Sequence, residues 1–311
     1  MLSRTAASLY WMGRYVERAE FTARLIEATL RLDALSASPA GPAAWEGALL
    51  VTAGDAGFAA SGASTSPHSV TQYLTLSAAN PSSIRSCLDA ARANAKSVRT
   101  ALTRDAWEAI NRAWLGLRGL ASTGGSQQTL ALIEMVRAET KGFEGALHRM
   151  LRNEAYAFIG MGAAIERADN TARLIDVKYH LLLPEGEKVG GIVDRDQWTT
   201  ILQTVSANTA YRWLYRDGLK PWLVADMLIL KSELPRSLAG SSEEVAQHLG
   251  FIGRRLGRQG EADRLVRRRQ QALSRTSIDS VFGQGLHEYL EAFLVENAQI
   301  DRAIAAQFKF G

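Results

Sequence analysis

E-R-A-E-F-T-A-R-L-I-E at residues 17–27 and E-R-A-D-N-T-A-R-L-I-D at residues 166–176 are two copies of one segment. The copies align without gaps at an offset of 149 residues, and 8 of the 11 positions are identical. At two other positions the first copy has Glu and the second has Asp, so the negative charge is kept. A duplicated core needs only its apolar pattern, yet here the charged residues recur as well. We therefore look for function in this repeat.

Both copies lie in long segments that have helical periodicity and contain no proline. At about 100° per residue, each copy places its charged residues on one stripe of the helix and its core-facing apolar residues on another. The two charged stripes are Gly13, Glu17, Glu20, Arg24 and Glu27, and Gly162, Glu166, Asp169, Arg173 and Asp176. Further apolar residues on a third side predict that each helix is packed on several sides.

Two structural interpretations of the charged stripes are open. One is a solvated face with pairs inside each helix, such as Glu20 with Arg24, that contribute about 0.2–0.5 kcal/mol each. The other is a buried cross-pairing between the copies, in which removing one partner costs roughly 3–5 kcal/mol. The cross-pairs predicted in that case are Glu17 with Arg167 or Arg173, and Glu166 with Arg18 or Arg24.

A functional interpretation, compatible with the cross-pairing, is a polar pocket between the two long helices. Carboxylates and guanidiniums meeting there could bind a charged ligand or a metal, or carry out acid–base chemistry. The candidate catalytic carboxylates are Glu17, Glu20, Glu166 and Asp169, and the candidate ligand-binding arginines are Arg18, Arg24, Arg167 and Arg173. We expect no metal, because an Arg lies one helical turn after the acidic pair in each copy. We also expect no cofactor.

The composition is that of an ordinary globular protein, with 47% hydrophobic and 22% charged residues in a chain of 311. Seven prolines and the absence of alternating β segments predict an all-α fold. Cys87 is the single cysteine, lies in an expected helix and is interpreted as a small buried residue rather than a nucleophile. No signal peptide and no apolar run of about 20 residues is present, so we expect a cytoplasmic protein without membrane contact.

Caps and breaks predict about nine or ten helices. The first runs from Ser3 to about residue 34, and the second repeat helix covers about 154–183. The others are expected at 80–102, where Asn80 and Pro81 signal a start, and at 105–120, 126–151, 197–214, 219–230, 243–256, 261–274 and 279–307. Residues 35–68, rich in Ala, Gly and Ser, are expected to form a loop region with one short helix near 45–52. The sequence thus predicts one domain, a multi-helix bundle around the two repeat helices, pseudo-duplicated as about 1–150 and 151–311.

Motifs for nucleotide-binding loops, zinc proteases and serine hydrolases are absent. Glu144 with His148 and Glu244 with His248 have the spacing of one helical turn, which is common on ordinary helix faces. The arginine-rich stretch 254–269 lacks interleaved aromatic residues, so we interpret it as a solvated face rather than a nucleic-acid site. Extra apolar faces on the repeat helices leave homo-oligomerisation open.

Further segments, most of them outside the repeat, form a recognisable set. They are M-L-S-R at 1–4, L-Y-W-M-G-R-Y-V-E-R-A-E at 9–20, N-P-S-S-I at 80–84, A-R-A-N-A at 91–95, V-R at 98–99, W-E at 107–108 with Asn111, L-P-R-S at 234–237 and G-L-H-E-Y-L at 285–290. In this combination the chain resembles the bacterial alpha-E domain family over nearly its whole length. Lys96 and Leu234 depart from it, since Arg and Phe are expected there.

The resemblance implies an all-helical protein that partners a circularly permuted ATP-grasp protein, often with a transglutaminase-like protease or a proteasome-like hydrolase. Such systems are thought to make or modify peptide bonds with ATP, so we expect an accessory or substrate-binding subunit. The alternative is an enzyme whose own Glu/Arg pocket acts on a charged, amino-acid-like ligand, and whether the chain is an enzyme stays open. Motif matches add Asn80 and Arg236 as ligand-binding candidates, and Ser237 beside them.

Overall fold

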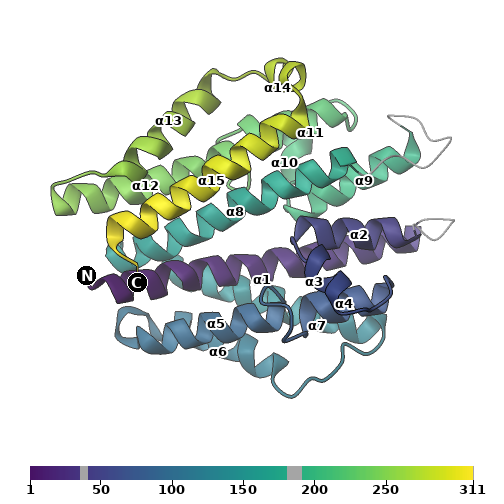
Figure 1. Ribbon diagram of the computed structural model, residues 1–311, viewed down its shortest axis with the longest axis horizontal. Helices are drawn as coiled ribbons and strands as arrows, with labels where there is room; N and C mark the ends of the chain where they lie inside the picture. Colours follow the sequence, from purple (N-terminus) through teal and green to yellow (C-terminus); the bar gives the residue numbers. More distant parts are fainter. Residues whose placement is uncertain (36–40, 181–190, 311) are drawn as a thin grey trace.

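A computed structural model describes residues 1–35, 41–180 and 191–310. These residues form 15 α-helices, one 3₁₀ turn (Arg99–Ala101) and no strand, which confirms the all-α prediction. Figure 1 shows long helices lying roughly side by side along the long axis, with shorter helices gathered toward one end. Within the described ranges, no helix is both long enough and apolar enough to cross a membrane.

Helices α1 (Ser3–Leu35) and α8 (Glu154–His180) carry the two repeat copies and lie together at the centre of the bundle (Figure 1). They run parallel, since residues 10–13 lie against 159–162 and, farther along both helices, residues 17–18 lie against 166–167. A Cβ atom added to Gly13 would come 2.2 Å from the carbonyl oxygen of Ile159. One added to Gly162 would come 2.0 Å from that of Tyr10, so glycine is required on both sides of this close approach.

The two central helices have similar surroundings. Helices α5 (Ile84–Ser97) and α7 (Ser126–His148) pack on α1, and α6 (Arg104–Leu117) packs on both of them. Helices α12 (Leu238–Leu256) and α15 (Leu286–Phe308) pack on α8, and α13 (Glu261–Arg275) packs on both of those.

Three shorter helices follow each central helix. After α1 come α2 (Gly41–Val51), α3 (Asp55–Ala60) and α4 (Pro67–Thr75), and after α8 come α9 (Ile192–Thr204), α10 (Asn208–Leu214) and α11 (Pro221–Leu230). Helix α14 (Ile278–Gln284) has no counterpart in the first half. The order of the other helices is therefore the same in both halves. The duplication over about 1–150 and 151–311 stays a prediction, and this order supports it.

The short helix expected near 45–52 is present as α2, but the rest of the segment 35–68 contains more helix than the predicted loop region allows. Helices α2 and α3 lie inside it and α4 begins at its end, while residues 36–40 lie outside the described part. Alanine has the highest helix propensity, and the segment also buries Trp45 and Phe58, which are 1% and 4% exposed. Tertiary packing thus determines the secondary structure of a segment whose composition alone favoured a loop.

Several helix boundaries also differ from the prediction, and the number of helices is larger. The segment 197–214 is broken near Ser206, whose φ is 58°, and 279–307 is broken at Gly285, whose φ is 104°. The helix expected from Asn80 begins at Ile84 instead, with the Ser83 side chain capping it by accepting from the Ser86 N–H. Left-handed residues and serine caps inside apolar segments are weak sequence signals, which explains these errors.

A charged layer crosses the centre of the bundle and divides its core in two. One apolar cluster contains α1 up to Val16 and α8 up to Ile165, and the other resumes at Ala19 and Ala168. The residues between these positions are the two Glu-Arg dipeptides of the repeat. Leu25, on the third side of α1, is buried among other described residues, so that side gives no support to homo-oligomerisation.

Candidate functional site

Crossed ion pairs connect the two copies of the repeat. Arg167 Nη2 lies 3.0 Å from Glu17 Oε2, and Arg18 Nε lies 2.6 Å from Glu166 Oε1. The cross-pairing predicted from sequence is confirmed for these partners. The alternative partners, Arg24 and Arg173, instead pair within their own helices, with Glu20 at 2.5 Å and with Asp169 at 2.7 Å. The expected pairs inside each helix thus form, but the solvated face does not hold for Glu20 and Arg24, which are buried; only Arg173 and Asp169 are partly exposed.

Each crossed pair receives another arginine. Arg236, in the turn before α12, donates to Glu17 and also lies 2.5 Å from Glu20. Arg14 lies 2.8 Å from Glu166 and 2.9 Å from Asp301 on α15. Sequence reasoning found Arg236 through the family resemblance and missed Arg14, although Arg14 lies one turn before Arg18 on the same helix. No local sequence signal pointed to Asp301.

Glu17 and Glu166 are held in the charged form. They are 6% and 2% exposed, and this burial by itself raises the pKa of each carboxyl group. The charges of Arg167 and Arg236 more than offset burial at Glu17 and lower its pKa from 4.5 to about 2. Arg18 and Arg14 likewise lower the pKa of Glu166. Both carboxylates are therefore ionised and fully occupied by guanidiniums near neutral pH.

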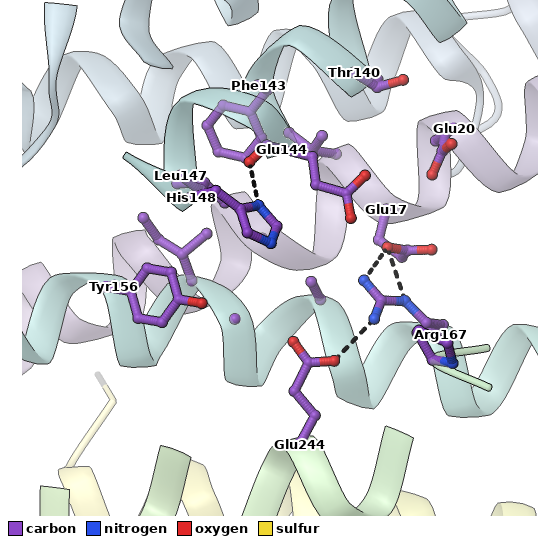
Figure 2. A pocket seen from close by; sticks show the side chains of 16 residues that line it. Glu17, Glu20, Thr140, Phe143, Glu144, Leu147, His148, Tyr156, Arg167 and Glu244 are labelled. Atoms are coloured by element: carbon purple, nitrogen blue, oxygen red, sulfur yellow. Dashed lines mark hydrogen bonds and ion pairs between the residues drawn. The ribbon is translucent and has the colours of Figure 1, made fainter. Parts of the chain in front are cut away.

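A first hollow of about 240 Å³ lies between α1, α7, α8 and α12 (Figure 2). Glu17, Glu20 and Arg167 line it, together with residues that sequence reasoning did not choose: Glu144, His148, Tyr156 and Glu244. Figure 2 shows the Arg167 guanidinium between Glu17 and Glu244, with Arg167 Nη1 2.9 Å from Glu244 Oε2. Glu144 is exposed, and its carboxylate makes no ion pair with any described residue. Three of the four residues in the two Glu–His spacings, Glu144, His148 and Glu244, thus line this hollow.

A second hollow of about 290 Å³ lies between α1, α8, α15 and the end of α2. The repeat residues that line it include Arg18, Glu166, Asp169, Asn170 and Arg173. Arg14, Ser82 and Asp301 also line it. Arg18 Nη1 lies 3.2 Å from the Ser82 hydroxyl oxygen. Asn170 is 7% exposed, and its amide nitrogen has no hydrogen-bond partner in the described part of the chain. An unused buried donor next to arginines favours a negatively charged or carbonyl-bearing guest.

The prediction of one pocket in which all four carboxylates meet is wrong. Glu17 and Glu20 line the first hollow, whereas Glu166 and Asp169 line the second, because the stripes of two parallel helices turn toward different flanking helices. Asn80 lines neither hollow, and its side chain donates to the Tyr73 carbonyl and accepts from the Ser82 N–H. It therefore shapes the turn that carries Ser82.

Two more of the predicted ligand-binding arginines, Arg24 and Arg236, contact the carboxylates of the first hollow but do not line it. Arg24 lies beyond the first hollow, where it bonds to Glu20 and Ser206. Arg236 is bonded behind Glu17 and Glu20, and its neighbour Pro235 forms part of the wall. Among the residues that the structure describes, no group of three or more His, Cys, Asp or Glu side chains is arranged to hold a metal ion.

Comparison with known families also draws attention to a Glu-Arg motif. A family model described as a predicted alpha-helical domain with a conserved ER motif matches residues 1–308. In this sequence the dipeptide Glu-Arg occurs at two places, Glu17-Arg18 and Glu166-Arg167, which are the residues of the crossed pairs. The match confirms the resemblance drawn from the sequence. No curated protein and no solved structure matches the chain.

Proposed function

The chain belongs to the Alpha-E family, and we propose that it is an accessory, substrate-binding subunit of an ATP-grasp-linked system that ligates or modifies peptides. In this proposal a circularly permuted ATP-grasp protein carries out the ATP chemistry in the cytoplasm. The Alpha-E chain holds a charged part of the substrate at the paired Glu/Arg hollows. A transglutaminase-like protease or a proteasome-like hydrolase belongs to the same system.

The observation that supports binding is that each crossed Glu/Arg pair lines a hollow, and that other charged groups of the hollow remain partly exposed to a guest. In the first hollow the exposed Glu144 and the one-third exposed Glu244 face the space, which favours a cationic group. In the second hollow Arg18 and Arg173 retain exposed fractions of 24% and 36%, next to the unpartnered Asn170. That arrangement favours a carboxylate or another anion.

The pKa values weigh against the alternative, an enzyme that uses these carboxylates for acid–base chemistry on an amino-acid-like ligand. A general base works best when its pKa lies near the operating pH. The pKa of Glu17 is about 2 and that of Glu166 is lowered, so both are weak bases. Burial raises the pKa of the Cys87 thiol to about 12, which removes it as a nucleophile. An enzymatic role would have to use Glu20, Asp169 or a residue outside the repeat.

Co-purification and peptide modification together test the proposal. We expect the chain to form a stable complex with the neighbouring ATP-grasp protein at micromolar concentration. The substitution Glu144→Gln should leave folding and the complex intact but lower peptide modification about tenfold, since one charge-assisted contact is lost. Glu134→Gln is the matched control, because Glu134 is exposed on the same helix and lies outside the hollow.

Three results would count against this function. Failure to co-purify with the ATP-grasp protein would remove the accessory role. Equal activity of the Glu144 and Glu134 variants would remove the first hollow as the binding site. Turnover of a peptide or amino acid by the Alpha-E chain alone, without the ATP-grasp protein, would establish the enzyme alternative.

A further inference from the structure

We propose that a third hollow, formed by α8 and α12 away from the crossed ion pairs, binds an oxyanion carried on an apolar or aromatic body. Its volume is about 420 Å³, larger than either Glu/Arg hollow and in the range of small-molecule sites. The residues that would hold the guest are Arg152, Tyr156, Gln247, His248, Phe251 and Arg254. This site lies outside the repeat and goes beyond the binding function proposed above.

The charge of the hollow is one-sided. Arg152 and Arg254 are both exposed, and neither makes an ion pair with a carboxylate in the described part of the chain. No Asp or Glu lines the hollow, in contrast to the two Glu/Arg hollows, in which carboxylates and guanidiniums alternate. Two guanidiniums without a carboxylate partner are suited to a phosphate or carboxylate group, which each can bind with two parallel hydrogen bonds.

The remaining walls are suited to the body of such a ligand. The Arg152 guanidinium lies 4.1 Å from the centre of the Tyr156 ring, which fixes its position by a cation–π contact. The Tyr156 and His248 rings meet edge to face at 5.5 Å, and Phe251 is partly buried beside them. Gln247 is exposed, and its amide nitrogen donates one N–H to Glu243 at 3.2 Å, which leaves the second N–H for the oxyanion. An aromatic or apolar group next to the oxyanion therefore has rings to pack against.

The hollow is also joined to the repeat through side chains. His248 is 8% exposed, and its Nε2 lies 3.7 Å from Glu244 Oε1. Glu244 in turn pairs with Arg167 of the second Glu-Arg dipeptide. Tyr156 lines both this hollow and the first Glu/Arg hollow. A ligand here would thus lie next to the first hollow, on the side away from Glu17.

Titration calorimetry on the full chain tests the proposal with three probes: phenyl phosphate, benzoate and inorganic phosphate. We expect binding of phenyl phosphate or benzoate that is tighter than that of inorganic phosphate. The stronger of the two organic probes shows whether the site takes phosphates or carboxylates. The double variant Arg152→Ala with Arg254→Ala should lose at least about tenfold in affinity, the usual effect of a lost charge-assisted hydrogen bond.

The matched control is Arg258→Ala with Arg268→Ala, which removes the same charge from exposed positions outside the hollow and should leave binding unchanged. Gln247→Glu is a second variant that keeps side-chain size, places a carboxylate in the hollow and should abolish binding. The proposal is overturned if the wild-type chain binds none of the probes at millimolar concentration. It is also overturned if both double variants lose affinity equally, or if Gln247→Glu binds as the wild type does.

Discussion

Glu17 and Glu166 occupy equivalent positions in two helices, and each is paired with two arginines. Glu17 is bonded by Arg167 and Arg236, and Glu166 is bonded by Arg14 and Arg18. A buried carboxylate with its guanidiniums removed would be left as an uncompensated charge, and the same holds for the arginines without the carboxylate. At the residue scale the repeat is therefore an ionic lock that also lines the two hollows proposed to bind the substrate.

Replacing Glu166 with Gln should destabilise the fold by roughly 3–5 kcal/mol, because Arg14 and Arg18 lose their common buried partner. Denaturant unfolding measures this loss. Glu139→Gln is the control, since Glu139 pairs with the largely exposed Arg112 and its loss should change stability by only about 0–1 kcal/mol. Similar stabilities for the two variants would show that the Glu166 pair contributes no more than a surface pair.

The stability of the protein should fall in acid, in a range set by Glu17. Its pKa is about 2 in the folded chain against 4.5 ordinarily, so the folded state binds fewer protons than the unfolded state between these values. The stabilisation is thus complete above about pH 4.5 and is lost as the pH falls toward 2. Unfolding followed from pH 7 to pH 2 should show a shallower loss for Glu17→Gln than for the wild type. Parallel curves for the two proteins would mean that Glu17 does not contribute to the acid sensitivity.

At the scale of helices, the parallel packing of α1 and α8 depends on glycines that face the opposite backbone. Gly13 and Gly162 are equivalent in the repeat, and each touches the other helix at a carbonyl oxygen. Any side chain there would push the helices apart and lengthen the ion pairs that begin one turn later, at Glu17 and Glu166.

Gly13→Ala should therefore destabilise the protein by about 1–3 kcal/mol, the usual cost of overpacking, although alanine is the better helix former. Gly145→Ala on α7 is the control, because nothing lies within 4 Å of its added Cβ and the substitution should stabilise by about 0.5–1 kcal/mol. Thermal unfolding should therefore shift in opposite directions for the two variants. A stabilised Gly13 variant would contradict the close approach of α1 and α8.

The sequence predicts the helices well in long segments with helical periodicity, and poorly in segments whose secondary structure depends on tertiary packing. The two repeat helices and the all-α class follow from periodicity and the absence of β patterns, whereas α3 forms in a segment whose composition favours a loop. For the site, the offset of 149 predicts which residues are equivalent and which cross-pairs are feasible. It does not show that the two stripes turn toward different neighbours, since α7, α12 and α15 bring Glu144, Glu244 and Asp301 from distant parts of the chain.

At the scale of the whole molecule, the charged layer separates two apolar clusters that would otherwise be one continuous core. A shift of α8 along α1 by one turn would leave the cores apolar but would separate Glu17 from Arg167 and Glu166 from Arg18. A buried polar layer can specify register in this way, even where it adds little net stability. We therefore expect the layer to control which packing forms as well as how stable it is.

The reaction of Cys87 with a thiol reagent measures how often the structure next to the charged layer unfolds. Cys87 is the single cysteine, is fully buried on α5, and has a pKa raised to about 12 by burial. A thiol reagent should therefore label the native protein only through unfolding, and Glu166→Gln should speed labelling by at least about 100-fold, matching a loss of about 3 kcal/mol. The labelling rate at pH 8 measures this effect. Labelling of the wild type as fast as a free thiol would contradict the burial of this region.

The most direct test of the crossed pair is a double-mutant cycle on Glu17 and Arg167, read by denaturant unfolding of the wild type, Glu17→Gln, Arg167→Gln and the double variant. If the two Glu-Arg dipeptides lock α1 to α8, the two substitutions should be strongly coupled, with an interaction free energy of about 1–3 kcal/mol. Effects that add to within about 0.3–0.5 kcal/mol would show that Glu17 and Arg167 act independently and that the crossed pair does not hold the bundle together.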